Sequence, residues 1–575
     1  MMIKRPKILN EFSPKNALEM ERELSRFHRS KGGYGYSQAV EKIQKVIGDS
    51  KVLKYPAGKV YNSWNTPVGW NLRGGFLRTV NPKKYIVSDL SLSPISAIFM
   101  SGPSNGIEKL KVIDVGSGES EEDYSQSVKG CAVLSNGNIS RVYDLAVEKF
   151  GARCVLSHFM RAQVEEIGRT PELMPQAVNY TSFPAYSKGE AFGFALTYKQ
   201  YKWMKSRSRS GKLEVEARMD VDRGTDDLEI LEARFGKSEN EKPLLLIAHL
   251  CHPKPGANDN ASGSALLTEI VRVLKKTDLN REIVALWVPE MYGTAAYLTD
   301  HVPDFELGVN LDMVGEDQCK TGSVLQVSST PWSLPSFISE LLFVNLETDR
   351  FRIKTGKYSG GSDHFILSDS TVKIPTTSLT QWPDRFYHSS EDTTDKSSVE
   401  SFEWIGKGVL NSIMDLTYEM PHIVATKISA NILKEFIVEY NTYEEPVIRD
   451  WMVTRARRKL RSLSKYADVK SVLNMIEKYS NFRDIPEKSS NLRRIKGPVA
   501  DSWMNSEDRE WFFKLTRKLP AWRDYKDELL NFMEIGFSVE DAIKLASCEF
   551  EISVDVSEDS RRYIKRLSEE SIINL

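Results

Sequence analysis

The chain has 575 residues, which is too long for one hydrophobic core and corresponds to roughly three or four domains of ordinary size. Its composition, 41% hydrophobic and 27% charged, is typical of a folded protein. The 78 basic and 79 acidic residues give a formal net charge of −1, which argues against a global attraction to nucleic acid or to an anionic membrane.

Cysteine usage and the first residues bear on the cellular setting. The five cysteines are few, odd in number and far apart, so they favour a reducing compartment over a disulfide framework. The start, MMIKRPKILNEFSPKN, has no apolar stretch of signal-peptide length, and no window reaches the roughly eighteen apolar residues of a spanning helix. We therefore expect a cytoplasmic protein without a membrane partner. The cysteines are Cys131, Cys154, Cys251, Cys319 and Cys548.

Residues 1–51 are expected to be helical. Apolar residues recur at helical spacing in NALEMERELSRF, residues 16–27. The Gly-rich KGGYGY interrupts this pattern, and SQAVEKIQKVIG then forms a second amphipathic stretch that ends at Gly48.

Residues 52–205 have a different texture. Short apolar, β-branched runs such as KYIVSDL, KVIDVGSG and GCAVLSN alternate with turn signals. A helix-like segment, SRVYDLAVEKFGA, lies between GCAVLSN and the next such run, RCVLSHF. We therefore predict a β-rich domain that contains strand–helix–strand units.

Residues 206–424 alternate strands and helices. LEVEARMDV and LEILEARF show strand alternation, whereas PLLLIAHL, EIVALWV and LGVNLDMVG are continuous apolar runs, as strands covered on both faces should be. ASGSALLTEIVRVLKK is an amphipathic helix between the first two of these apolar runs. The order predicts an α/β domain with a mixed, mostly parallel sheet and helices on both faces.

Residues 425–575 are mostly helical in pattern. RARRKLRSLSKY places six basic residues in one helical stretch, and a solvated helix face explains them better than a nucleic-acid surface does. Helices followed by EFEISVDVSEDSRRYIKRL suit a small winged-helix-like module, used for oligomer contacts or for control of access. We expect a homo-oligomer.

Metal-ligand residue types follow the buried strands of the α/β domain. PLLLIAHLCHP and EIVALWVPE each end in such residues, GANDNASG follows in a turn before a helix, and DRFYHSSEDTTD is a later loop. Ligands of open α/β sheets sit beyond the carboxyl ends of the strands, so we expect these side chains to converge. They are His249, Asp259, Glu290, Asp312 and His388, with Cys251 and His252 beside the first.

Imidazole and carboxylate groups are the donors that Zn²⁺ takes, and a catalytic zinc keeps one position open for water. A carboxylate that bridges two metal ions gives a clamp on the attacking and leaving groups of a hydrolysis. Any one of these motifs alone is more often a structural turn or strand end. Their joint occurrence, in order and each near a strand end, favours a metal-dependent hydrolase.

The run H-x-C-H-P, G-A-N-D-N-A-S-G, P-E-x-x-G-T, N-L-D-M-V-G, G-S-D-H, Y-H-S-S-E-D-T resembles the co-catalytic zinc exopeptidase family of bacterial leucyl aminopeptidase, carboxypeptidase Q and glutamate carboxypeptidase II. The resemblance covers about residues 240–400. It implies that His249 and Asp312 hold one zinc, that Glu290 and His388 hold the other, and that Asp259 bridges them. Asn260 stands where the family often has a second Asp.

Two departures from the family pattern leave alternatives open. Cys251 and His252 follow His249 where the family has an Asp that orients the imidazole. The ligand is then His249, which we favour, or His252, or the thiolate of Cys251. The family's Glu-Glu pair is reduced to Pro289-Glu290, so Glu290 is named both as general base and as ligand. The divergent branch with H-x-C-H-P and P-E-x-x-G-T shares these features.

Two loops are expected to contact the substrate. Gly360, Gly361 and Ser362 of GGSDHFIL would allow a close approach of the peptide backbone. Further candidates for binding the substrate terminus or the tetrahedral intermediate come from the same loop and from TQWPDRFYH. They are Asp363, His364, Asp384 and Tyr387, of which Tyr387 is the first choice.

The resemblance implies four regions. Residues 1–51 would belong to the peptidase domain, 52–205 would be a protease-associated-like domain or an unrelated β-rich one, 206–424 the catalytic domain, and 425–575 a C-terminal helical domain. The expected function is a zinc-dependent aminopeptidase acting on peptides with one or two Zn²⁺, for which Co²⁺ or Mn²⁺ would substitute. The alternatives are a carboxypeptidase, a single-zinc amide hydrolase or cyclase of the same fold, and a catalytically dead binding protein.

Overall fold

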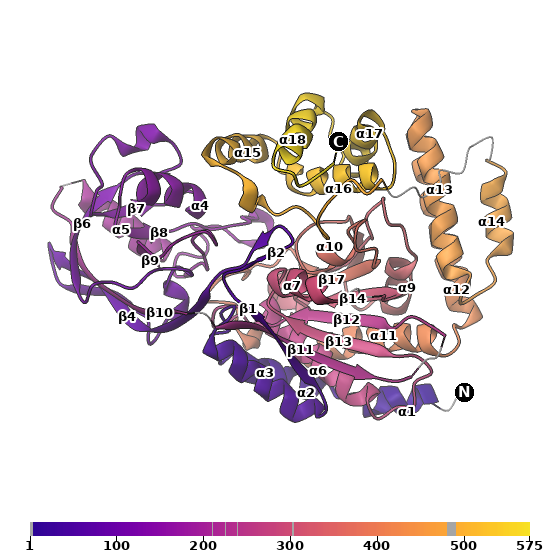
Figure 1. Ribbon diagram of the computed structural model, residues 1–575. Coiled ribbons are helices and arrows are strands. Elements are labelled where there is room, and N and C mark those ends of the chain that lie inside the picture. The colour runs from indigo at the N-terminus through magenta and orange to yellow at the C-terminus, as the bar shows by residue number, and fades with distance from the viewer. Residues whose placement is uncertain are drawn as a thin grey trace.

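The computed structural model describes residues 4–209, 211–224, 226–237, 240–301, 304–479 and 490–574. Two large β-sheets with their own helices make up the left and centre of Figure 1, and C-terminal helices lie above and to the right of the central sheet. Within these described ranges, no helix has the length and apolar character needed to cross a bilayer.

The central sheet has eight strands in the order β1-β11-β13-β12-β14-β17-β15-β16. Neighbours from β13 through β12 and β14 to β17 are parallel, as are β15 and β16, whereas β1–β11, β11–β13 and β15–β17 are antiparallel. The predicted mixed α/β sheet is thus confirmed. The strands are β1 (Lys51–Pro56), β11 (Asp227–Phe235), β12 (Leu244–His249), β13 (Ile283–Val288), β14 (Leu307–Leu311), β15 (Val324–Ser328), β16 (Ile353–Gly356) and β17 (Thr376–Trp382).

Both faces of this sheet are covered, as the continuous apolar runs predict. Alternate residues of β12 separate cleanly: Leu244 and Leu246 join one apolar cluster, and Leu245 and Ile247 join another. N-terminal and central helices cover the first face, and α7 lies on the second. The helices are α1 (Lys4–Glu11), α2 (Pro14–Leu24), α3 (Tyr34–Ile47), α6 (Gly263–Leu274), α9 (Ile338–Leu346) and α11 (Val399–Thr417) on the first face, with α7 (Tyr292–Asp300), α8 (Gln318–Thr321) and α10 (His364–Leu367) elsewhere in the domain.

The second sheet has seven strands in the order β5-β4-β10-β6-β7-β8-β9 and encloses its own apolar cluster. Its strands β6 to β9 run parallel up to one edge of the sheet, and a long antiparallel ribbon of β4 and β10 lies toward the other edge. The strands are β4 (Gly69–Asn81), β5 (Tyr85–Asp89), β6 (Glu108–Asp114), β7 (Ala132–Ser135), β8 (Cys154–Ser157), β9 (Phe192–Ala195) and β10 (Glu214–Gly224); α4 (Ile139–Val142), α5 (Tyr198–Ser208) and the hairpin β2 (Val60–Tyr61) and β3 (Trp64–Asn65) accompany them.

The predicted boundaries of the β-rich domain, 52–205, differ from the strand pairing in the structure at both ends. The strand at 51–56 pairs with β11 in the central sheet, and the strand at 214–224 pairs with β4 and β6 in the second sheet. LEVEARMDV and LEILEARF have the same alternating pattern, so their sequences do not reveal that they belong to different sheets. A protease-associated identity for this domain stays a prediction.

The C-terminal region is helical, as predicted, but its described residues do not support the winged-helix-like expectation. Its described residues contain helices and one isolated bridge, between Arg493 and Ile573, and no strand that would form a wing. These helices share one continuous apolar cluster with the central sheet. They are α12 (His422–Thr442), α13 (Pro446–Leu463), α14 (Lys470–Glu477), α15 (Ser506–Lys518), α16 (Trp522–Glu534), α17 (Val539–Glu549) and α18 (Ser557–Glu569).

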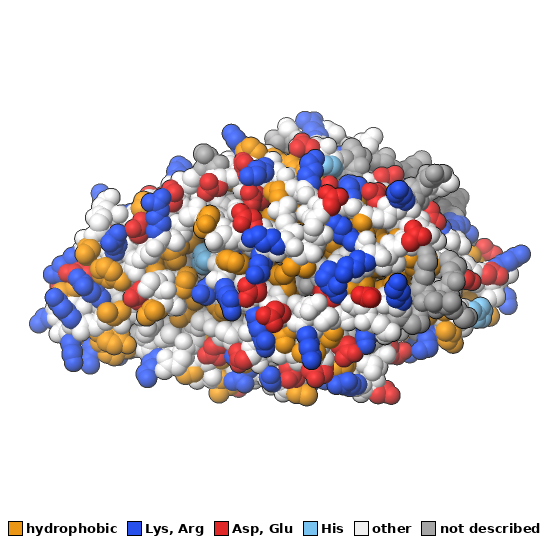
Figure 2. Space-filling model, turned by 90° about the horizontal axis from the view of Figure 1, so that it is seen from below, with side chains coloured by type: hydrophobic (Ala, Val, Ile, Leu, Met, Phe, Trp, Pro, Cys, Tyr) orange, Lys and Arg blue, Asp and Glu red, His pale blue; other side chains and the backbone are white. Residues whose placement is uncertain are grey.

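The basic helix α13 contributes two of its charges to the interior. Arg455 is 4% exposed and pairs with Glu435 and Glu439 of α12, at 2.5 Å from each carboxylate. Lys459 pairs with Glu435 at 2.7 Å and with Glu340 of α9 at 2.6 Å. These two residues therefore form neither a solvated face nor a nucleic-acid surface. On the face shown in Figure 2, basic and acidic side chains are interspersed.

Replacing Arg455 with Met should destabilise the protein by about 3 kcal/mol, the lower end of the range for a broken buried ion pair, because both glutamates keep some contact with water. Lys434→Met, at an exposed position of the adjacent helix α12, should change the stability by less than about 0.5 kcal/mol. Calorimetric melting of the three proteins at one scan rate measures the difference. Equal melting temperatures for the two variants would show that the Arg455 pairs contribute nothing.

Candidate metal centre

The strand ends of the central sheet bring the predicted residues together. His249 ends β12, Glu290 is the second residue after β13, and Asp312 comes directly after β14. Asp259 lies in the loop that leads into α6, and His388 lies in the loop after β17. Except for Glu290 and His388, whose side chains are 27% and 16% exposed, these side chains are at least nine-tenths buried.

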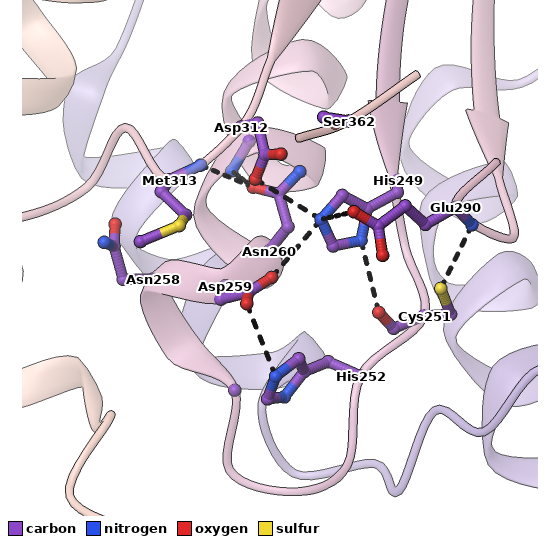
Figure 3. A network of polar contacts seen from close by, with 12 residues as sticks. His249, Cys251, His252, Asn258, Asp259, Asn260, Glu290, Asp312, Met313 and Ser362 are labelled. Carbon is purple, nitrogen blue, oxygen red and sulfur yellow. Dashed lines mark hydrogen bonds and ion pairs between the residues drawn. The ribbon is translucent and has the colours of Figure 1, made fainter. Parts of the chain in front are cut away.

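Asp259 stands at the middle of this group. Its Oδ1 is 3.2 Å from His249 Nε2, which is also 3.3 Å from Asp312 Oδ1. Its other oxygen, Oδ2, is 2.9 Å from His388 Nε2 and 3.5 Å from His252 Nε2. Figure 3 shows Asp259 between His249 and His252. Each oxygen of one carboxylate thus faces its own set of ligand atoms.

The spacings fit metal coordination. Two ligands at 2.0–2.2 Å from one tetrahedral zinc lie about 3.3 Å apart, and the contacts around Asp259 range from 2.9 to 3.5 Å. Asp312 Oδ1 and His252 Nε2 are buried and make no hydrogen bond of normal geometry, which is uncommon for buried polar atoms unless they serve another purpose. The donor set, imidazole and carboxylate, is the one that zinc prefers.

Backbone carbonyl groups orient two of the imidazoles. His249 Nδ1 lies 3.2 Å from the Cys251 carbonyl oxygen, and His252 Nδ1 lies 2.8 Å from that of Pro253. With Nδ1 engaged in this way, Nε2 of each ring is left to face Asp259, as is usual for metal-binding histidines. The Cys251 carbonyl oxygen thus lies beside His249 Nδ1, where the family resemblance implies a carboxylate.

Glu290 lies on the His249 side of the centre. Its Oε1 is 3.9 Å from His249 Nε2, and its backbone N–H donates to Cys251 Sγ at 3.1 Å. The structure groups Glu290 with His249 and Cys251, and groups His388 with His252 and Asp259. The pairing of Glu290 with His388, which the family resemblance implies, is therefore not the one that the structure brings together.

Burial raises the pKa of Glu290 to about 7, against the opposing effect of His249 and Lys31. This carboxyl therefore gains and loses a proton near neutral pH. Burial opposes protonation of His249, but the carboxylates of Glu290 and Asp312 outweigh it and raise the pKa of this imidazole. Burial lowers the pKa of His252 to about 3, so His252 stays neutral and able to donate its lone pair.

The candidate substrate residues divide into two groups. Four lie in the interior: Asp363 accepts hydrogen bonds from Met291 N at 2.7 Å and Thr294 Oγ1 at 2.6 Å, and Asp384 accepts from Phe386 N at 2.6 Å. These four side chains are at most 3% exposed, and a role for them in binding substrate stays a prediction; they are Ser362, Asp363, His364 and Asp384. Gly361 is exposed, and the partly exposed Tyr387 stacks on His388 with ring centres 3.8 Å apart.

Sequence reasoning missed the residues that hold the Asp259 loop. Asp392 accepts hydrogen bonds from the backbone N–H of Asn258 at 2.7 Å and of Asp259 at 3.2 Å. Asn260 accepts from Met313 N at 3.0 Å and so joins this loop to the end of β14. The fully buried Arg29 donates to the Gly256 carbonyl at 2.7 Å. Asp392 stands in the quoted SSEDT string, four residues after His388, which was a usable signal.

The fold and this cluster define the class, a domain built like a metal-dependent hydrolase. Residues 230–413, which include all the candidate ligands, match the model of peptidase family M28. The match to a peptidase family is consistent with a peptide hydrolase. It covers residues 230–413 and not the flanking regions.

Two curated relatives align with parts of the chain. Aminopeptidase YwaD from Bacillus subtilis is 30% identical over 174 residues, which cover 28% of this chain and 38% of that protein. A Clostridium acetobutylicum protein, provisionally named for polysaccharide biosynthesis and for an aminopeptidase-like domain, is 32% identical over 83 residues, or 14% of this chain and 19% of that protein. The chain thus spans less than half the length of each relative.

Solved structures show the same fold over more of the chain. A candidate peptidase from Clostridium acetobutylicum aligns with a TM-score of 0.55 and 17% identity, over 83% of this chain and 99% of its own. BSAP, a zinc aminopeptidase from Bacillus subtilis, aligns with a TM-score of 0.53 and 19% identity, over 71% of this chain and 95% of its own.

Replacing Asp392 with Asn should weaken metal binding roughly 10- to 100-fold, because one of its oxygens becomes an amide that cannot accept a backbone N–H of the Asp259 loop. Asp395→Asn, in the same loop but with a 70% exposed side chain, is the matched control and should leave the affinity unchanged. Competition with a zinc-binding dye measures both affinities. Equal affinities for the two variants would show that Asp392 does not support the centre.

Proposed function

We propose that the chain is a zinc-dependent exopeptidase, with aminopeptidase activity as the expected form. One observation carries the proposal: the two oxygens of the buried Asp259 face separate groups of ligand atoms at the spacing of tetrahedral zinc. The M28 match over residues 230–413 supports the same conclusion. A binding protein that had lost catalysis would have no need of this buried and costly arrangement of charge.

The ligand assignment differs from the family pattern on one side. His249, Asp312 and Asp259 would hold one zinc, and His252, His388 and Asp259 would hold the second. His252 thus takes the place that the resemblance gives to Glu290. Zinc bound here supplies Lewis-acid chemistry, in that it lowers the pKa of water and polarises a carbonyl oxygen.

Because this assignment does not use Glu290 as a metal ligand, its carboxylate is available as the general base. Its carboxylate is the most exposed acid of the centre, and its pKa of about 7 suits proton transfer at neutral pH. It would accept a proton from the attacking water and deliver it to the leaving amine. Asp363 fixes its position by binding Met291 N and Thr294 at the start of α7.

A carboxypeptidase and a single-zinc amide hydrolase or cyclase are alternatives on the same fold. The number of bound metal ions separates the single-zinc enzyme from the two exopeptidases. The expectation of a cytoplasmic homo-oligomer also stays a proposal.

Metal counting tests the proposal. The purified protein should hold about two zinc ions per chain, and His252→Ala and His388→Ala should each hold about one, because each removes a ligand of the second group. Elemental mass spectrometry gives the ratio, and His422→Ala, an exposed histidine on α12, is the control. Full zinc in His252→Ala would refute the ligand assignment. A wild-type protein that neither binds zinc nor loses peptide hydrolysis to a chelator would refute the proposed function.

Replacing Glu290 with Gln separates its two candidate roles. As a general base, Glu290 should be needed for turnover and not for metal, so the variant should keep its zinc and lose roughly 10²- to 10⁴-fold in kcat. Glu282→Gln, just before β13 and paired on the surface with Arg234, is the matched control for a carboxylate change near the same strand. Loss of zinc together with activity in Glu290→Gln would instead make Glu290 a ligand.

A further inference from the structure

Lys31 reaches the metal centre from outside the M28 match. It lies in the segment between α2 and α3, within the KGGYGY run, far from the other site residues in sequence. Its Nζ is 3.9 Å from Glu290 Oε2 and stands over the Tyr292 ring at 4.7 Å from the ring centre. The side chain is 19% exposed, so the ammonium is largely, but not completely, withdrawn from water.

The ammonium group has unused hydrogen-bonding capacity. At 3.9 Å, its pairing with Glu290 is too long for a hydrogen bond, and Lys31 Nζ donates no hydrogen bond to the residues that the structure describes. A lysine has three N–H donors, and a largely buried ammonium is costly without strong partners. For comparison, the buried Lys459 meets two carboxylates at 2.6 and 2.7 Å.

The position of Lys31 relates directly to the reacting bond. Glu290 lies between Lys31 and His249. Its Oε2 is 3.9 Å from Lys31 Nζ, and its Oε1 is 3.9 Å from His249 Nε2. Successive backbone carbonyl carbons of a peptide are about 3–4 Å apart. A substrate whose reacting carbonyl lies beside His249 and Glu290 therefore places a group one residue away within reach of the ammonium.

We infer that Lys31 forms a carboxylate-binding subsite, so that the enzyme prefers substrates with a free carboxylate next to the scissile bond. The inference rests on the proposed function. The shared chemistry is a carboxylate that accepts charge-assisted hydrogen bonds from the ammonium. It has two sources, the C-terminal carboxylate of a dipeptide or the acidic side chain of the residue at the cleaved bond.

Two matched substrate pairs separate these sources. The first pair is alanyl-alanine and alanyl-alaninamide, which differ only in the terminal carboxylate. The second pair is the p-nitroanilides of glutamate and glutamine, which differ only in the side chain. For each pair, the readout is the ratio of kcat/KM for the acid to kcat/KM for its neutral partner, with the full zinc-loaded chain.

The wild-type protein should prefer the acid in at least one pair, and Lys31→Met should lower that ratio roughly 10- to 100-fold. Lys31→Arg keeps the charge and should retain most of the preference. Lys42→Met is the matched control, because Lys42 lies on α3 and pairs with Glu23. A lysine that only positions Glu290 would change both members of a pair equally, so an unchanged ratio in Lys31→Met would overturn the inference.

Binding without turnover keeps the inference separate from the proposed function. Calorimetric titration of the zinc-loaded protein with alanine and with alaninamide, and with glutamate and glutamine, compares the same groups as products. Tighter binding of an acid that disappears in Lys31→Met supports the subsite even if no peptide is cleaved, in which case the proposed function alone fails. Equal binding of acid and amide by wild type, together with equal turnover, would overturn the subsite.

Discussion

Around Asp259, three imidazoles and several carboxylates share a space from which water is largely excluded, and much of the fold serves to hold them there. The carboxylate of Asp259 attracts the Nε2 atoms of three neighbouring imidazoles. It can do so only while the loop that carries Asp259 is held in place. Asp392 holds this loop through two backbone N–H groups, and Arg29 holds its start through the Gly256 carbonyl. These supports come from the loop after His388 and from the N-terminal segment, which also packs on the central sheet through its apolar residues.

The sequence was sufficient to predict the central sheet and the residues at its edge, because β12, β13 and β14 are continuous apolar runs and each is followed closely by a metal-ligand residue type. It was not sufficient to predict strand partners. Pairing of β10 and β11 with different sheets depends on long-range contacts that two similar alternating patterns do not encode. The winged-helix expectation depended on strand partners in the same way. EFEISVDV has a strand-like local pattern, but the described C-terminal region contains no strand with which it could pair.

The site also shows how one substitution in a pattern is accommodated by backbone geometry. The Asp that orients the first imidazole in the family is Cys251 here, and the carbonyl oxygen of the same residue meets His249 Nδ1 instead. The next residue, His252, then turns its own Nε2 toward Asp259. One short segment after β12 thus contributes two imidazoles to two sides of a single carboxylate. In the proposed ligand assignment, His252 takes the place of the second Glu that the family resemblance implies.

The C-terminal helices belong to this arrangement more closely than their place in the sequence indicates. Asp524 of α16 accepts a hydrogen bond from Gly360 N at 2.9 Å, at the start of the loop that carries Asp363. Asp363 in turn fixes the start of α7 through Met291 N, directly after Glu290. Most of α16 is buried, so this helix offers a fixed support for the loop. The position of the candidate base is therefore set by residues of two separate regions: the central domain that carries Asp363, and a helix near the end of the chain.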